Sequence, residues 1–149
     1  MIGVVLVSHG KMAEGVKDSV ELIMGSFEQF VTSSLVAGQD FEEFKLDVQE
    51  KIKSVHTGDG VIVFVDLFGA SPYNAFMQSY QTLLQANVNA RVVTGFNLPM
   101  VLEVLGTREF DLSVEEAASQ AVSGSQDAIQ EPVSELLAKV NEKEEDDGY

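Results

Sequence analysis

Cysteine is absent from this sequence, and histidine occurs only twice, at His9 and His56. The lack of cysteine excludes disulfides, thiol chemistry and zinc sites built on thiolates. Two histidines so far apart in the sequence also argue against a metal site made of several imidazoles. We therefore predict that the protein holds no metal and no cofactor.

Basic residues and long apolar runs are also scarce. Nine Lys and Arg stand against 24 Asp and Glu, which gives a formal net charge of −15. Such a charge repels nucleic acid phosphates and anionic membrane surfaces, and it favours a basic protein partner. The amino terminus carries no signal-like segment, and no apolar run approaches the ~20 residues that span a bilayer. These features predict a cytoplasmic protein that does not bind nucleic acid.

Apolar runs do alternate with amphipathic segments along the chain. The two most apolar runs contain no polar residue, as expected of parallel strands that are buried on both faces. This alternation predicts an α/β fold: an open, mostly parallel sheet of order 2-1-3-4 with helices on both faces. The predicted strands are 2–7, 30–36, 60–65 and 89–94, and the predicted helices are 12–24, 40–55, 72–84, a short helix within 95–106, and 113–122.

The pattern changes after Gly124. Residues 127–133 ("DAIQEPV") predict a short strand, which Pro132 restricts to a sheet edge because proline cannot donate a ladder hydrogen bond. One or two helical turns are predicted over 134–141. Five carboxylates against one lysine at 142–149 predict a solvated, disordered end. We therefore expect one domain at 1–133, followed by a short helical turn and an acidic tail at 134–149.

Two polar side chains follow the two most apolar strands. His9 comes after the first strand and Asp66 after the third. In the predicted order these strands are neighbours, about 4.8 Å apart, and ligands of open parallel sheets bind beyond the carboxyl ends of the strands. A carboxylate on one imidazole nitrogen would fix the tautomer and leave the other nitrogen free to act as a nucleophile.

The residues after Asp66 favour an anion site. Gly69 and Ala70 are small enough to let the backbone come close, and Ser71 is predicted to cap a helix that starts at Pro72. Exposed N–H groups at a helix start attract a phosphoryl group. The combination predicts phosphoryl transfer through a phosphohistidine.

Purely structural interpretations exist for each of these residues. His9 could be an ordinary loop residue, Asp66 could cap a turn, and Ser71 with Pro72 could simply begin a helix. The functional interpretation depends on finding all of these residues together, at the ends of strands that are predicted to be neighbours. His56 follows an amphipathic helix and is predicted to lie at the surface, whereas Met24 is predicted to be a core residue that could line the pocket.

Three motifs in the same order resemble a known family. "VVLVSHGKMAEGV", "VDLFGASPYNA" and "TGFNLPMVLEVL" are similar to the IIA component of mannose-family phosphotransferase system (PTS) sugar transporters. The resemblance implies a phosphotransferase in which His9 takes a phosphoryl group from the phosphocarrier HPr and passes it to a IIB component that serves the IIC/IID permease. It also implies that Asp66 bonds the other imidazole nitrogen, and that Ser71 and nearby amides hold the phosphoryl oxygens.

The resemblance also implies a homodimer in which the carboxy-terminal strand crosses to the partner's sheet as an antiparallel edge. The segment 127–133 falls where that strand is expected. Some relatives fuse IIA to IIB through an Ala/Pro-rich linker, and the acidic tail here leads us to expect IIB as a separate polypeptide. Leu67 stands where a threonine can occur in relatives, so it is left out of the predicted site.

Other classes share parts of the pattern. Histidine phosphatases carry an arginine before the nucleophilic histidine, where this chain has Ser8, and small chelatases need further ligands that His56 is badly placed to provide. A receiver domain needs an acidic pair at the end of the first strand. The subunit that serves dihydroxyacetone kinase, or a regulatory module controlled by phosphorylation, remain as alternatives that would use the same His9.

Overall fold

The computed structural model describes residues 1–146, which form four strands and six helices. Strands and helices alternate from β1 to α4, and two further helices follow within the described residues. The elements are β1 (Gly3–His9), α1 (Met12–Met24), β2 (Phe30–Leu35), α2 (Phe41–Ser54), β3 (Val61–Val65), α3 (Ser71–Gln85), β4 (Ala90–Thr94), α4 (Leu98–Thr107), α5 (Val114–Gln126) and α6 (Pro132–Asp146).

The four strands form one parallel sheet of order β2-β1-β3-β4, which confirms the predicted fold class and strand order. β3 is buried along its whole length, and β1 is buried except at its last residue. This burial explains why both strands appear in the sequence as uninterrupted apolar runs. The register pairs Val7 with Val65 and His9 with Leu35, so the carboxyl ends of β1, β2 and β3 lie together.

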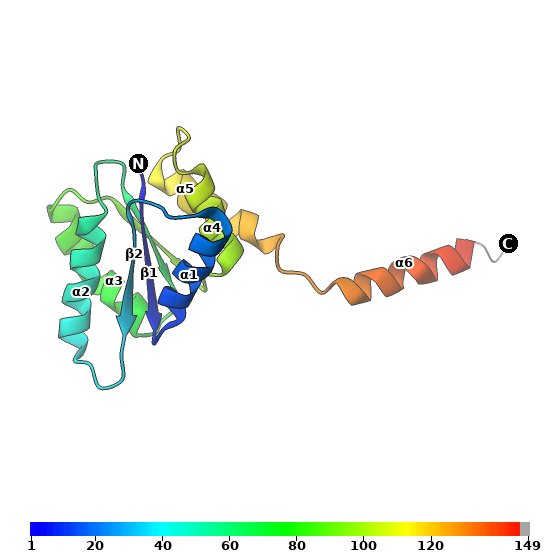
Figure 1. The fold of residues 1–149 in the computed structure, drawn as a ribbon, viewed down its shortest axis with the longest axis horizontal. Coiled ribbons are helices and arrows are strands. Elements are labelled where there is room, and N and C mark those ends of the chain that lie inside the picture. Colours follow the sequence, from blue (N-terminus) through cyan, green and yellow to red (C-terminus); the bar gives the residue numbers. More distant parts are fainter. Residues whose placement is uncertain (147–149) are drawn as a thin grey trace.

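Helices cover both faces of the sheet (Figure 1). α2 and α3 pack on one face, where the alternate strand residues Val5, Val7, Val63 and Val65 meet the buried side of both helices. α1, α4 and α5 pack on the other face against Val4, Leu6, Ile62 and Phe64. Because side chains alternate along a strand, each of the two central strands contributes to both cores.

The segment after α5 does not form the predicted edge strand. Residues 127–131 form a turn and a short linker, and Pro132 begins α6, which runs away from the sheet (Figure 1). The carboxylate of Glu131 accepts hydrogen bonds from the backbone N–H groups of Val133 and Ser134. The Ser134 side chain first, and then these backbone bonds, lower the pKa of that carboxyl. A capping carboxylate followed by proline is an efficient helix start, which explains why a helix forms where the end of the strand was predicted.

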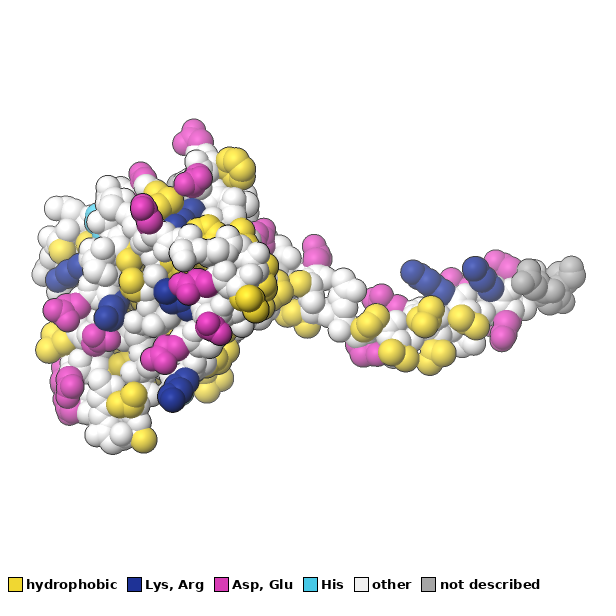
Figure 2. Space-filling model, in the orientation of Figure 1, with side chains coloured by type: hydrophobic (Ala, Val, Ile, Leu, Met, Phe, Trp, Pro, Cys, Tyr) yellow, Lys and Arg dark blue, Asp and Glu magenta, His cyan; other side chains and the backbone are white. Residues whose placement is uncertain are grey.

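α6 is also longer than the one or two turns predicted. It continues to Asp146, so the part of the predicted disordered tail at 142–146 is helical, while 147–149 lie outside the described residues. Every residue of α6 is exposed, including an apolar stripe of Val133, Leu136, Leu137 and Val140 that Figure 2 shows along the helix. Of the helices that the structure describes, none combines the length and apolar character needed to cross a membrane.

A buried arginine holds the amino ends of the strands together. Arg108, at the end of α4, is only 4% exposed. Its Nη1 donates to the carbonyls of Ile2 (3.2 Å) and Gln29 (3.1 Å), and its Nη2 donates to the carbonyl of Glu28. The guanidinium also lies over the ring of Phe27, 5.6 Å from its centroid. Burial lowers the pKa of Arg108, while the charges of Glu109 and Glu28 act in the opposite direction. The three carbonyl dipoles also stabilise the buried guanidinium.

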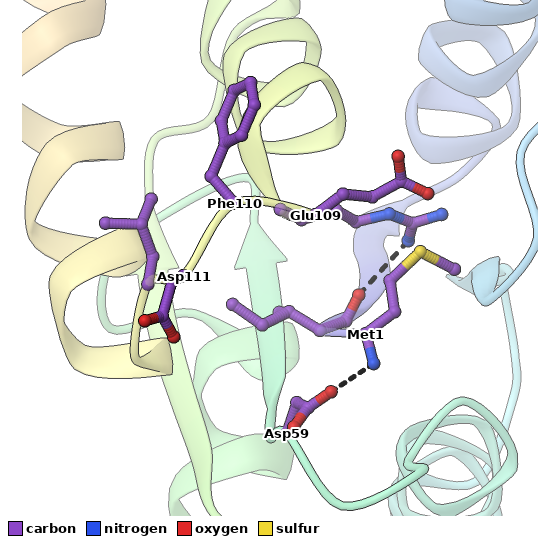
Figure 3. Close-up of a pocket in the computed structure, with 8 residues that line it drawn as sticks. Met1, Asp59, Glu109, Phe110 and Asp111 are labelled. Atoms are coloured by element: carbon purple, nitrogen blue, oxygen red, sulfur yellow. Dashed lines mark hydrogen bonds and ion pairs between the residues drawn. The ribbon is translucent and has the colours of Figure 1, made fainter.

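A surface hollow of about 430 Å³ lies beside this arginine (Figure 3). The amino group of Met1 pairs with the carboxylate of Asp59 on one side of the hollow, and Glu109, Phe110 and Asp111 lie around it. The pairing with the amino terminus lowers the pKa of Asp59. These contacts anchor the start of β1 at the end of the sheet opposite His9.

We predict that Arg108→Ala destabilises the fold by about 3 kcal/mol, because it removes the donor to the buried Ile2 carbonyl together with the bonds to the Gln29 and Glu28 carbonyls. Urea unfolding followed by circular dichroism measures this change. Lys53→Ala is the matched control, since it removes the same charge from an exposed position. Equal midpoints for the two variants would show that Arg108 does not hold the strands together.

Candidate active site

His9 and Asp66 meet at the carboxyl ends of β1 and β3, where the strand order led us to expect them. One oxygen of Asp66, Oδ2, lies 2.8 Å from the His9 Nδ1 atom and accepts a hydrogen bond from the His9 backbone N–H at 2.9 Å. The Asp66 side chain is 11% exposed, whereas that of His9 is 49% exposed. A largely buried carboxylate thus holds both the backbone and the ring of an accessible histidine.

This contact determines which ring nitrogen can react. With Asp66 as a carboxylate, Nδ1 is the nitrogen that carries the proton, so Nε2 keeps its lone pair. The second oxygen of Asp66, Oδ1, is buried and has no hydrogen-bond partner within residues 1–146. The two bonds to His9 are therefore the ones that hold this carboxylate in place. The arrangement holds the ring in a defined orientation and leaves the Nε2 lone pair available to act as a nucleophile.

The loop between β2 and α2 forms one wall beside His9. A hollow of about 470 Å³ is lined by His9, Gly10 and residues 35–39. The backbone N–H of Gly10 donates to the carbonyl of Leu35 at 2.8 Å, which ties this loop to the histidine turn. Sequence reasoning missed this wall, although the predicted adjacency of the first two strands was the signal that could have found it.

The predicted phosphoryl-binding residues lie on the loop that follows Asp66. Gly69 has a φ of +78°, and a Cβ added there would meet nothing within 4 Å. The glycine is thus explained by its left-handed backbone conformation and not by a close approach. Ala70, not Ser71, is the residue before α3, so the helix begins one residue earlier than predicted. The Asn74 side chain donates to the Gly69 carbonyl at 3.3 Å and closes the loop.

Met24 is not part of this site, so that prediction was wrong. α1 starts just after His9 and ends at Met24, which lies with Met1 and Glu28 at the amino ends of β1 and β2. There it lines a hollow with Phe27, Leu105 and Arg108. His56 follows α2 at the same amino-terminal end, far along the chain and the sheet from His9. Within residues 1–146, no three His, Cys, Asp or Glu side chains are grouped so that they could hold a metal ion.

Two exposed apolar side chains follow Asp66 directly. Leu67 is 59% exposed and Phe68 is 71% exposed, and the Phe68 ring packs on Tyr73 with 4.9 Å between centroids. Met12 and Val36, on the neighbouring α1 start and β2–α2 loop, are also exposed. Sequence reasoning did not identify these exposed apolar residues, because isolated apolar residues in loops have no periodicity.

Comparison with known proteins shows the family of the chain. The family model described as PTS system fructose IIA component, EIIA-man, matches residues 3–122. The chain belongs to this family. It is 30% identical over 142 residues to the PTS system mannose-specific EIIAB component of Escherichia coli, covering 95% of this chain and 42% of that protein. It therefore spans about two fifths of the length of that relative.

Relatives that are similar in length to this chain are named for sugars other than mannose alone. The chain is 27% identical to the PTS system fructose-specific EIIA component of Bacillus subtilis, covering 98% of this chain and 96% of that protein. Among solved structures, the mannose/sorbose specific IIA subunit from Enterococcus faecalis has a TM-score of 0.75 at 27% identity, covering 87% of this chain and 93% of that one. The EIIA structure from Streptococcus agalactiae reaches a TM-score of 0.78 at 24% identity and supports the fold.

We predict that Asp66→Ala changes the protonation pattern of the His9 ring. In the wild type at a pH where the imidazole is neutral, nitrogen NMR should show the proton on Nδ1. In the variant the proton should move largely to Nε2, because no acceptor remains beside Nδ1. His56 is the control within the same spectrum and should not change. An unchanged His9 signal would show that Asp66 does not set the tautomer.

Proposed function

We propose that this protein is a phosphoryl carrier of a sugar-transport PTS, accepting the group on His9 from phospho-HPr and passing it to a IIB component. The observation that supports this most directly is the contact between Asp66 and His9 Nδ1, which leaves Nε2 of an exposed imidazole free. Membership of the PTS IIA family supports the same assignment. As a phosphotransferase it would work in the cytoplasm and serve the IIC/IID permease through IIB.

The proposed reaction is an in-line transfer between two imidazoles. The Nε2 lone pair of His9 forms a bond to phosphorus while the bond from phosphorus to the donor's histidine breaks. The proton on Nδ1 stays on His9 throughout, and Asp66 stabilises the positive character that develops on the ring. Transfer to IIB is the same step in reverse.

Gly69, Ala70 and Ser71 are proposed to hold the phosphoryl oxygens. They form the end of the loop after Asp66 and the start of α3, whose residue 70 supplies no side-chain cap to the helix. A helix start without a side-chain cap leaves N–H groups available to an anion. Leu67 offers no hydroxyl, so in this proposal the Ser71 hydroxyl and the backbone carry this part of the site.

The surroundings of His9 suit a protein partner. Met12, Val36 and Leu67 lie on the segments that follow His9, β2 and Asp66, and each is more than two fifths exposed, which gives a docking protein apolar side chains to cover. The net charge of −15 would draw a basic partner to the surface before these contacts form. Both features support protein-to-protein transfer over the use of a free small molecule.

We further propose that the protein is a homodimer in which a second copy covers the β4 edge. β4 has a neighbour on one side only, and a hollow of about 520 Å³ beside it is lined by Phe68, Tyr73, Met77 and Ile129 among others. The apolar stripe of α6 is likewise uncovered in one chain. An exposed edge and an exposed apolar stripe on the same molecule favour association.

The carrier function predicts that label from phosphoenolpyruvate, delivered through enzyme I and HPr, appears on the wild type and is lost in His9→Ala. The label should be labile in acid and stable in base, as expected of phosphohistidine. His56→Ala is the matched control and should accept label like the wild type.

Two results would separate the alternatives. Label on His9 that no IIB component accepts would favour the regulatory module or the dihydroxyacetone kinase subunit. No label on the wild type, with HPr shown to be phosphorylated, would contradict the carrier function altogether.

The dimer predicts that the wild type sediments at twice the mass of the chain at micromolar concentration. Replacing Leu136 and Leu137 together by serine should shift it to the monomer, since these side chains are 61% and 57% exposed in the single chain and would lose their apolar cover. Lys139→Ala, on the same helix, should leave the mass unchanged. A wild type that sediments as a monomer contradicts the proposal.

A further inference from the structure

The turn that carries His9 is tied to helix α1 by a buried hydroxyl. Ser8, the residue before His9, is completely buried. Its Oγ accepts a hydrogen bond from the backbone N–H of Ala13 at 2.8 Å, and it lies 3.4 Å from the Gly10 carbonyl, to which it donates. The two bonds close a short loop that contains His9, Gly10 and the first residues of α1.

The Ser8 hydroxyl caps helix α1, although Ser8 lies three residues before the N-cap residue Lys11. The residue before α1 is Lys11, and its side chain makes no capping hydrogen bond. Ala13 is buried, so its N–H has no access to water and depends on the Ser8 hydroxyl as its acceptor. The start of α1 is therefore set by a residue of β1 and not by its own cap.

Three hydrogen bonds from different elements hold the backbone of residues 8–13, which carries the imidazole. The His9 N–H donates to Asp66 after β3, and the Gly10 N–H donates to the Leu35 carbonyl at the end of β2. Gly10 has a φ of +56°, which turns the chain sharply between these two bonds. The Ser8 hydroxyl adds a third bond, to the Ala13 N–H at the start of α1. Without this bond, we expect the turn to move relative to α1 while the bonds to Asp66 and Leu35 remain.

We propose that Ser8 is a positioning residue that keeps the His9 ring aligned with Asp66. It does not contact the reacting nitrogen, and it acts through the backbone of residues 9–13. A shift of about 1 Å in the position of a reacting group costs up to roughly 100-fold in rate. This inference rests on the proposed function for its effect on transfer, but the alignment of the ring can be measured without any transfer.

The test compares Ser8→Ala with Ser79→Ala. Ser79 is also completely buried and hydrogen-bonded, to Gln49 and to the Ala75 carbonyl, but it lies in the middle of α3. Both variants should lose stability. Only Ser8→Ala should shift the His9 proton away from Nδ1 in nitrogen NMR, and only Ser8→Ala should slow phosphoryl transfer from HPr, by roughly 10- to 100-fold.

Two further variants keep the test decisive. Ser8→Thr retains the hydroxyl and should restore the wild-type His9 spectrum. If Ser8→Ala does not fold, Ser8→Cys replaces it, because a thiol has nearly the same shape and is a weaker acceptor. A folded Ser8→Ala or Ser8→Cys with the wild-type His9 tautomer would overturn the positioning role. A wild type that takes no phosphate would instead contradict the carrier function, while the spectrum would still decide the role of Ser8.

Discussion

The parallel pairing of β1 with β3 is the constraint on which the site depends. Both strands run through the middle of the sheet with apolar side chains on both faces, so their register is fixed by two cores at once. A slip by one residue would exchange the two faces of the strand and is strongly disfavoured. Because Val7 is opposite Val65, the residues that follow must come together, and Asp66 can reach both the backbone and the ring of His9.

The same pairing explains why so much of the fold could be predicted from the sequence. Strands buried on both faces leave a strong signal, namely short apolar runs without alternation, and the polar residue at the end of each run marks the edge where a site can form. His9 and Asp66 could be found this way because each breaks an otherwise apolar pattern. Nothing beyond strand order was needed to bring them together.

The parts that were missed depend on contacts without a sequence pattern. Arg108 lies in a helix end and bonds backbone carbonyls from two distant segments, which no periodicity indicates. Met24 was misplaced because helical spacing gives the buried face of α1 but not which end of the sheet each residue reaches. The 127–133 segment has strand-like composition, but the Glu131 carboxylate accepts bonds at the start of a helix that begins at Pro132, and this local signal outweighs the composition.

The position of Asp66 answers an objection to the proposed phosphoryl transfer. A carboxylate near a dianionic group should repel it, and a chain with a net charge of −15 adds to that repulsion. Asp66 contacts only the Nδ1 side of the ring, so the imidazole separates it from Nε2. Its charge is also partly neutralised by two donors of His9. The carboxylate therefore acts mainly on the ring. In the proposed transfer, the positive potential for the phosphoryl oxygens would come from backbone N–H groups and from a basic partner. If the proposed transfer is right, the negative surface favours docking of a basic partner. The repulsion between this charge and a phosphoryl group on Nε2 is limited at His9, because Asp66 lies on the Nδ1 side of the ring.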